Sequence, residues 1–388
     1  MQTVATSSLT ADDIEILPVT TRAEMERFIR LPERLQANDK NFIPPLRFER
    51  RMAFSPKSNP LFEFTDVGFW LACRNGIDVG RISAQIERRA IEIHKDDTGY
   101  FGCIAAEDDP LVFQALTSTA ESWLRARNMR RVHGPFNLSI NEELGLLVDG
   151  FDTPPMLLMG HDLPYVGKRL EEQGYKREKD VLAYLYDTEQ DMPVAVRRLI
   201  DRPLPANVTL RHVDLKRLRA EVDAITNIFN DAWSGNWGFV PLSEAETDHL
   251  AKSLRPLLHE KLVWFVDVDG EPAGFIVCLP NMNDAIADLQ GKLFPFGWAR
   301  FLWRLKVRGV TTARVPLMGV KRKFSSGLLG TLLPFLIIDA VRREAAKLGY
   351  RQVELSWILE DNLPMRRINE ALEGKPYKTY RIYDKLLT

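Results

Sequence analysis

The chain carries one hydrophobic and polar pattern twice, 194 residues apart. Residues 70–80 and 264–274 share a Trp at the first position, Asn-Gly or Asp-Gly at the sixth and seventh, and Gly at the eleventh. Apolar runs on both sides of Asn-Gly or Asp-Gly predict two strands joined by a two-residue turn. We therefore expect one β-hairpin in each half of the chain.

The segments after the two hairpins also correspond. Each half has an amphipathic helical stretch that leads into a strand, and each half ends on an aromatic-rich strand. The stretches are 120–128 before 131–133 with a final strand at 174–186, and 340–349 before 352–355 with a final strand at 374–383. In the second half we further expect a strand over 208–213, a helix over 218–233, a strand over 314–320 and a helix over 332–348.

These patterns predict an α/β protein built from two tandem versions of one domain, each a mixed, mostly antiparallel sheet flanked by helices. We place a disordered N-terminus at 1–12, a first domain at 13–190, a linker at 191–206 and a second domain at 207–388. The linker contains the Pro-rich segment 202–206.

Composition fits an ordinary soluble globular protein, with 388 residues, 45% hydrophobic and 27% charged. Residues 1–12 lack the basic start and apolar core of a secretory signal, and no apolar run reaches the length of a membrane span, so we expect a cytoplasmic protein. Cys73, Cys103 and Cys278 are widely spaced in apolar strand-like runs. We expect them to be reduced core residues, and we expect no disulfide framework and no metal site.

Positive charge is concentrated in one segment. Between Leu289 and Ile338 there are nine Lys or Arg and no Asp or Glu, while the rest of the chain holds 43 basic and 53 acidic residues. A local positive field indicates a local anionic partner. Because the segment is also rich in Leu, Phe and Trp, an acyl-CoA, an anionic membrane surface or both fit it better than nucleic acid.

Within this segment, a helix over 297–308 would place Trp298, Phe301, Leu302 and Leu305 on one face and three arginines on another. This pattern is typical of a helix that lies in a lipid interface, although an amphipathic helix packed on its own core would look the same. The absence of acidic residues and the preceding Leu-Phe-Pro-Phe at 293–296 favour peripheral membrane contact, with Trp298 and Phe301 as the contacting residues.

A Gly-bearing turn follows the strand at 314–320 and precedes an apolar helix. Free backbone N–H groups at such a helix N-terminus bind phosphate. The candidate pyrophosphate loop consists of Ser326, Gly327, Leu328, Leu329, Gly330 and Thr331. At the matching place in the first half stand Glu107, Asp108 and Asp109, whose charges would repel a pyrophosphate, so we expect only the second half to bind this ligand.

The first half instead carries a long polar loop after residue 132. Carboxylates and imidazoles in such a loop can bind an ammonium group and can accept a proton from it. The candidates are Glu142, Glu143, His133 and His161. A helix-capping role for Glu142 and a satisfied core position for His133 remain open alternatives.

On the glycines at 327 and 330, the hairpin before them and the strand and turn at 354–362 after them, the second half resembles the GNAT superfamily of acyl-CoA-dependent N-acyltransferases. The resemblance implies that Asn362 contacts the cofactor at the start of the last helix. The two glycines are separated by two residues where the superfamily usually has one. The Tyr that many members use as general acid on that helix is also missing, since Arg367, Ile368 and Asn369 fill the region.

The whole chain is similar to the tandem-GNAT family that includes bacterial ceramide synthases. This resemblance rests on Gly134-Pro-Phe-Asn137, Asn141-Glu142, Gly150-Phe-Asp-Thr-Pro-Pro155, the segment 354–362 and Tyr377-Lys-Thr-Tyr380-Arg-Ile-Tyr383. It implies transfer of a fatty acyl group from acyl-CoA to the amine of a long-chain base such as sphinganine or its 3-keto precursor. It also makes Asn137, Asn141 and Trp357 candidate substrate contacts.

The mechanism that we expect is direct transfer. The backbone of Met318, Gly319 and Val320 would align the pantetheine as an added strand, and Glu142, Glu143 or Glu354 would accept the amine proton. Transfer to another amine, a non-catalytic acyl-CoA or lipid sensor, and an RNA partner for the basic segment remain alternatives. Oligomeric state, chain-length preference and the identity of the amine are not determined by the sequence.

Overall fold

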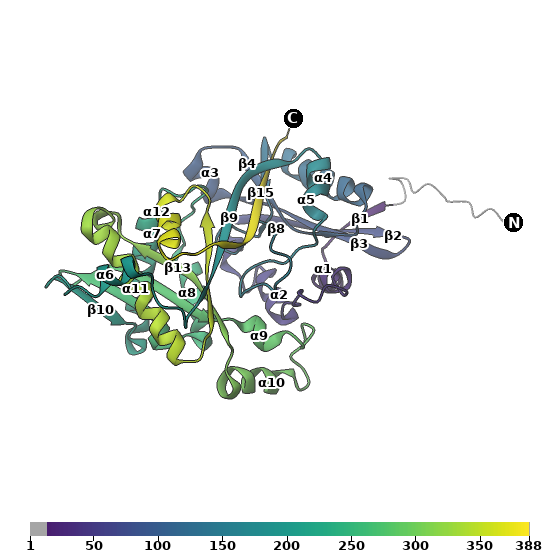
Figure 1. Cartoon of the computed structure of the whole chain (residues 1–388). Coiled ribbons are helices and arrows are strands. Elements are labelled where there is room, and N and C mark those ends of the chain that lie inside the picture. The colour runs from purple at the N-terminus through teal and green to yellow at the C-terminus, as the bar shows by residue number, and fades with distance from the viewer. Residues whose placement is uncertain (1–13, 388) are drawn as a thin grey trace.

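The computed structural model describes residues 14–387, and the predicted disordered segment 1–12 lies outside them. One mixed sheet of 13 strands runs through the described residues (Figure 1). In spatial order its strands are β1 (Ile14–Pro18), β2 (Thr65–Arg74), β3 (Ile77–Glu87), β4 (Thr98–Ala106), β5 (Arg131–Gly134), β15 (Pro376–Leu386), β9 (Lys176–Asp187), β14 (Gln352–Leu359), β13 (Thr312–Val320), β12 (Glu271–Pro280), β11 (Val263–Val268) and β10 (Val208–His212), and β8 (Leu146–Asp149) also pairs with β15.

Both predicted hairpins are present. β2 pairs antiparallel with β3, and β11 pairs antiparallel with β12. The turn residues Asn75, Gly76, Asp269 and Gly270 all have positive φ, between 52° and 77°. Asn, Asp and Gly tolerate this left-handed conformation better than other residues, which explains why the same dipeptides recur in the two halves.

The repeat extends through the rest of each half. Hairpin, strand, helix, strand, helix and final strand follow in the order β2, β3, β4, α4 (Pro110–Arg125), β5, α5 (Val166–Glu172), β9, and again in the order β11, β12, β13, α11 (Gly327–Lys347), β14, α12 (Leu363–Ala371), β15. The pairs β4–β5 and β13–β14 are parallel, whereas the other ladders are antiparallel over the described residues. The predicted fold class is thus confirmed.

The final strands of the two halves are exchanged. β15, at the end of the second half, lies between β5 and β9, and β9, at the end of the first half, pairs with β14. The repeat did not predict this exchange. Because the two halves share one pattern, the sheet of each half offers an equivalent edge to either final strand. The two halves therefore share one continuous sheet at their junction.

Helices cover both faces of each half. In the first half, α4 packs on one face, and α1 (Arg22–Leu35) and α2 (Arg47–Ala53) lie on the other. In the second half, α11 packs on one face and α7 (Leu218–Trp233) on the other. The remaining helices are α3 (Arg88–His94), α6 (Val194–Ile200), α8 (Glu244–Leu254), α9 (Met282–Ile286) and α10 (Gly297–Trp303).

The predicted linker 191–206 contains α6, and Met192 before this helix and Val196 and Ile200 within it are buried in the core beneath α11. One local prediction needs correction. Helix α11 begins at Gly327, five residues before the predicted start, so Pro334 lies inside the helix and not in its first turn. The predicted strand before it and the predicted helix over 218–233 agree with β13 and α7.

Cys73, Cys103 and Cys278 are buried free thiols, as predicted. Among residues 14–387, no helix has both the length and the apolar character that a membrane crossing requires. The domain boundaries themselves stay predictions.

Candidate active site

A cleft opens where β13 and β14 separate. The two strands are paired from Thr312–Gln352 to Val315–Leu355 and then diverge. The space beyond this point has a volume of about 480 Å³. Its walls come from both strands, from the end of α7 and from the start of α12: Trp233, Asn236, Val315, Pro316, Met318, Leu355, Ser356, Trp357, Ile358, Leu359, Asn362 and Met365.

Three sequence candidates, Met318, Trp357 and Asn362, therefore meet in this cleft. Trp357 packs edge-on against Trp233 with ring centroids 5.5 Å apart. The side chain of Asn362 caps α12 by accepting a hydrogen bond from Met365 N–H at 3.2 Å. Asn362 thus lines the cleft and also stabilises the start of the last helix.

The backbone of β13 offers alternate residues to the cleft. Lys321 N–H donates to Ala273 O of the preceding hairpin at 2.8 Å, so the backbone groups of Gly319 also point toward β12. Those of Met318 and Val320 point toward the open edge. Trp233 Nε1–H already donates to Met318 O at 3.2 Å. Of the three residues predicted to align a pantetheine, Gly319 directs its backbone groups toward β12 and not toward the open edge of β13.

The predicted phosphate loop lies at the N-terminus of the 21-residue helix α11. Ser326 is the N-cap residue, and its side chain makes no capping hydrogen bond. Gly327 has φ of +64°, and a Cβ on Gly330 would lie 2.3 Å from the carbonyl carbon of Ser325. Both glycines are therefore required by the path of the loop, which leaves backbone donors at the helix N-terminus for an anion.

The positive charge of the basic segment is partly neutralised. Lys321 and Lys323 both pair with Glu271 and lower the pKa of that carboxylate to about 2. Arg300 and Arg304 pair with Asp288, and Arg314 pairs with Glu354. The sequence count missed these pairs because the acids lie outside the acid-free segment and reach it only through the fold.

Glu354 is fully buried on β14 and accepts several hydrogen bonds. Ser356 Oγ–H and Tyr377 O–H donate to its two carboxylate oxygens, and Arg314 Nε lies 3.3 Å from Oε1. Arg314 also donates to Ser356 Oγ at 2.8 Å and to Leu157 O at 2.8 Å. Because Ser356 lines the cleft, its hydroxyl connects the cleft with the carboxylate of Glu354.

Two more buried groups lie beside this network. Lys378 Nζ donates to Gly150 O and Thr153 O, and burial lowers the pKa of Lys378 to about 8. Tyr380 O–H donates to Gly160 O at 3.2 Å, and burial together with the charge of Glu354 raises its pKa. The segment after residue 150 therefore joins the first half to the Glu354 network.

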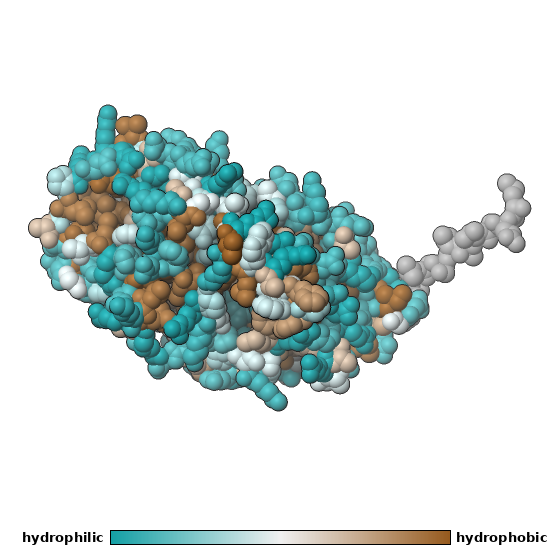
Figure 2. Space-filling view, turned by 90° about the horizontal axis from the view of Figure 1, so that it is seen from below, coloured by the Kyte–Doolittle hydropathy of each residue, from teal (hydrophilic) through white to brown (hydrophobic). Residues whose placement is uncertain are grey.

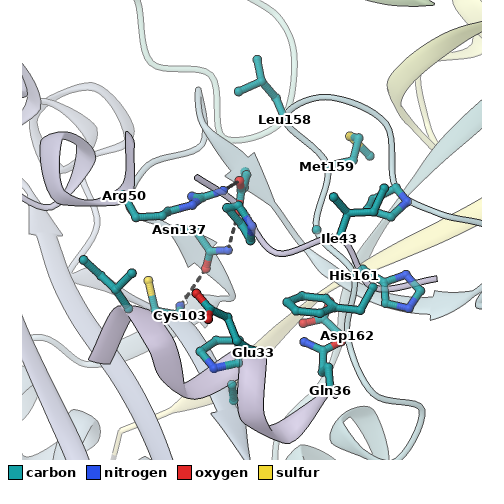
Figure 3. Close-up of a pocket in the computed structure, with 18 of the residues that line it drawn as sticks. Glu33, Gln36, Ile43, Arg50, Cys103, Asn137, Leu158, Met159, His161 and Asp162 are labelled. Carbon is teal, nitrogen blue, oxygen red and sulfur yellow. Dashed lines mark hydrogen bonds and ion pairs between the residues drawn. The ribbon is translucent and has the colours of Figure 1, made fainter. Parts of the chain in front are cut away.

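A larger cavity lies in the first half, where β4 and β5 diverge (Figure 3). The space between its walls, open solvent included, is about 1190 Å³. Its walls come from α1, α2, the loops after β5 and residue 154, and α9 of the second half. Glu143, Asn137 and His161 line it, so three further sequence candidates share one cavity.

Charged groups in this cavity are only partly paired. Arg50 pairs with Glu143 and, although burial opposes the shift, lowers the pKa of that carboxylate. Asn137 Nδ2 donates to Glu143 Oε2 at 3.2 Å, and Asn137 Oδ1 accepts from Cys103 N–H at 2.7 Å. Figure 3 shows Arg50, Asn137 and Cys103 on one wall and His161 and Asp162 across from them.

Asp162 has a different environment. It accepts a hydrogen bond from Leu147 N–H at 2.9 Å, and burial raises its pKa to about 7. Glu49, on the exposed side of α2, also lines this cavity. His161 Nε2 lies 2.9 Å from Asp39 Oδ2, and burial lowers the pKa of His161. A cation that entered would be stabilised by Asp162 and Glu49.

The structure does not bring Glu142, Asn141 and His133 into either cavity. Glu142 accepts from Asn59 Nδ2 at 3.1 Å, and burial raises its pKa to about 7. Asn141 Nδ2 donates to Val240 O at 3.1 Å. His133 stands 3.1 Å from Asp384 and packs on Trp237.

With Glu178, His133 and Asp384 place potential metal-ligand atoms within 4.8 Å of one another. Arg131 Nε, however, lies 2.7 Å from the same Asp384 oxygen. A guanidinium therefore already neutralises the carboxylate that a cation would need.

The helix α10 lies at the lower edge of the molecule in Figure 1, and a π-helical turn over Arg304–Arg308 extends it. Phe301 packs against Leu46, Ile286 and Leu289, and Leu305 packs against the core beneath α7. The predicted apolar face is thus partly anchored to the protein. The exposed apolar side chains of the segment are Phe294, Phe296, Trp298, Leu302, Trp303 and Val307. Figure 2 looks onto this side and shows hydrophobic patches among hydrophilic ones.

The strand order and the diverging parallel strands define a tandem GNAT fold. With a TM-score of 0.56 and 15% identity, the chain resembles a tandem GNAT protein from the clavulanic acid biosynthesis pathway over 97% of this chain and 99% of that one. With a TM-score of 0.52 and 13% identity, it resembles a GCN5-related N-acetyltransferase from Sphaerobacter thermophilus over 97% and 96%. These likenesses support the fold.

The sequence relatives are closer. The chain is 55% identical over 378 residues to the bacterial ceramide synthase of Caulobacter vibrioides, which covers 97% of this chain and 98% of that protein. It is 42% identical over 363 residues to Protein YghO of Escherichia coli, covering 93% of each. No family model matches the sequence. The chain belongs to the bacterial ceramide synthase family.

Sequence reasoning missed the roles of Arg314, Ser356, Tyr377 and Asp162. The spacing Glu354-Leu-Ser356 was the available signal, since residues two apart on a strand share a face. Arg314 and Tyr377 come from other strands, and only the pairing of β13 with β14 brings Arg314 opposite Glu354.

Proposed function

We propose that this protein transfers a fatty acyl group from acyl-CoA to the amine of a long-chain sphingoid base. The observation that carries the proposal is the cleft between β13 and β14, since β13 is followed in sequence by the loop 326–331 and by helix α11, whose N-terminus has no side-chain cap. A pantetheine chain would lie along the open edge of β13 at Met318 and Val320. The pyrophosphate would bind the backbone N–H groups of the loop 326–331.

The cavity of the first half supplies the site for the amine. Asp162 and Glu49 would bind the ammonium group, while the apolar walls around Ile43 and Ile286 would accept part of the long chain. Leu157 lines this cavity, and its carbonyl accepts from Arg314 of the Glu354 network. The amine site and the thioester site thus approach each other across Arg314 and Ser356.

The proton of the attacking amine would leave through Ser356 to Glu354. The neutral amine nitrogen attacks the thioester carbonyl carbon, a C–N bond forms, the C–S bond breaks, and CoA leaves as the thiolate, which takes a proton from solvent. Ser356 Oγ accepts the amine proton as it passes its own proton to Glu354. Arg314 holds the hydroxyl in place and stabilises the negative charge of Glu354 before the transfer.

The test is incubation with palmitoyl-CoA and sphinganine, with free thiol and lipid mass followed together. We expect one N-acyl product for each thiol released. Tight CoA binding without either product would contradict the assigned acceptor or the enzymatic role. It would then favour another amine or a sensor.

Peripheral membrane contact is a second part of the proposal. Phe294 and Phe296 are 78% and 81% exposed beside α10, and Lys292, Lys306 and Arg308 belong to the same segment. Ile43 and Ile286 contact both this apolar cluster and the amine cavity. A long-chain base would therefore pass from a bilayer to the cavity over a short apolar path.

Flotation with anionic vesicles checks this contact. We expect the wild type to float and the Phe294→Glu, Phe296→Glu variant to remain at the bottom. The matched control is Ile77→Glu, which changes an exposed apolar residue of the β2–β3 turn. Equal flotation of all three proteins would refute the membrane contact.

A further inference from the structure

A third cavity, which opens to solvent, lies between the sheet of the second half and helix α11. Its apolar part is lined by Ile276, Val315, Ile338, Val341, Val353, Leu355, Met192 and Leu372. Polar and charged residues, namely Asp187, Thr188, Gln190, Asp191 and Arg342, line it as well, and Gln190 and Asp191 are exposed after β9. The cavity therefore runs beneath the paired part of β13 and β14 toward the surface.

The other end of this cavity meets the thioester cleft. Val315 and Leu355 are the last paired residues of the two strands, and both line the apolar cavity as well as the cleft. Val315 and Leu355 therefore belong to the boundary that the two spaces share. Valine is restricted at χ1, whereas leucine moves more freely between rotamers, so Leu355 is the residue that would open the passage.

We propose that this apolar cavity holds the acyl chain of the acyl-CoA donor, with Leu355 as the gate between chain and thioester. The inference rests on the proposed acyl-CoA-dependent function and adds the site that selects chain length. A thioester bound at the ladder end would direct its first methylene groups between Val315 and Leu355 into the space under α11. The chain would then lie against Ile338 and Val341.

The chemistry of the walls favours an acyl chain over the amine substrate. The residues of its apolar part carry no charge, whereas the larger cavity of the first half is lined by Glu33, Glu49, Arg50, Arg81 and Asp162. The amine group of the long-chain base could pair with the carboxylates of that cavity, whereas an acyl chain carries no group that could do so. In the apolar cavity each buried methylene strengthens binding by roughly fourfold, so affinity for the donor rises with chain length until the cavity is full.

Substitutions on α11 test the site. Val341→Phe fills the cavity and Ile338→Ala enlarges it, and both positions are buried. The matched control is Val277→Phe, a buried valine of β12 in the core under α7 that lines neither the cavity nor the cleft. Dissociation constants for palmitoyl-CoA and butyryl-CoA are measured by calorimetry for each full-length protein, and turnover with sphinganine is measured in parallel.

We expect Val341→Phe to reduce the preference for palmitoyl-CoA over butyryl-CoA at least tenfold, and Ile338→Ala to keep or raise it. Val277→Phe should leave this ratio unchanged even if it weakens both constants. An unchanged ratio in both α11 variants, with normal wild-type turnover, overturns the acyl cavity alone. Chain-length-dependent binding without turnover supports the cavity and contradicts the proposed function. Failure of the wild type to bind either donor overturns both.

Discussion

Helices α4 and α11 occupy the same place in the two halves, but their N-termini are built differently. Asp109 caps α4 by accepting from Leu111 N–H at 2.9 Å, Pro110 removes another donor, and Asp109 pairs with Arg74 at 2.6 Å. Ser326 makes no side-chain cap on α11. One fold thus gives a helix whose N-terminus is already satisfied and a second helix whose donors remain for a ligand.

The two cavities beside these helices differ in the same sense. The first-half cavity is lined by carboxylates, among them Asp162 with its raised pKa, and would fit a cation, whereas the loop 326–331 of the second half presents backbone donors and would fit an anion. Duplication followed by different loop residues therefore separates amine and phosphate binding between the halves. This division of roles is the proposal that the following experiments sharpen.

The largest effect should come from Glu354→Gln. Loss of the proton acceptor should lower kcat by about a hundredfold while CoA affinity stays within twofold. The matched substitution in the first half is Glu143→Gln, which should mainly raise the KM for the amine. Steady-state kinetics distinguish the two, and equal kcat values for Glu354→Gln and the wild type would remove Glu354 from the chemistry.

Ser326→Asp should make α11 resemble α4. The new carboxylate would cap the helix and repel the pyrophosphate, so CoA affinity should fall by roughly tenfold. Ser326→Asn supplies a cap without charge and should weaken CoA binding less. Calorimetry gives both constants. If Asp and Asn have the same effect, the charge difference between the two helices is irrelevant to the ligand.

Asp162 should make stability depend on pH. Its pKa is about 7 in the folded protein and near its usual value when unfolded, so the folded state binds more protons between about pH 4 and pH 7. Stability should therefore fall as pH rises through this window, by at most about 1.4 kcal/mol per pH unit. Asp162→Asn should flatten this dependence in urea unfolding. Parallel curves for both proteins would contradict the assigned pKa.

Glu271→Gln should have the smallest effect. It releases Lys321 and Lys323 beside the phosphate loop, so CoA should bind about two- to threefold more tightly at low salt. The gain should disappear at high salt. A gain that persists in 1 M NaCl would require a cause other than charge.

Local patterns predicted the repeat and its turns, because Asn-Gly, Asp-Gly and the loop glycines impose backbone conformations that few other residues adopt. They also predicted that Asp109 and its neighbours exclude the phosphate from the first half. Local patterns did not predict the Glu354 network, because Arg314, Ser356 and Tyr377 come together only when the strands pair. The early start of α11 at Gly327 was hidden because glycine and serine are weak helix signals.

Counting charges along the sequence located the basic segment correctly, but it overestimated the positive electrostatic field of that segment. Asp288 and Glu271 come from outside the acid-free stretch and pair with four of its basic residues, so they offset part of its charge. Periodicity likewise grouped Phe301 with Trp298, but packing against Leu46 and Ile286 turns Phe301 inward. Both differences arise from tertiary contacts that no local window contains.

The most direct test of the division between the halves is the structure of the protein with palmitoyl-CoA bound. The account predicts one CoA per chain, with the pantetheine between β13 and β14, the pyrophosphate at residues 326–331 and no CoA beside α4. A CoA molecule in the first-half cavity, or a pyrophosphate away from the N-terminus of α11, would contradict it.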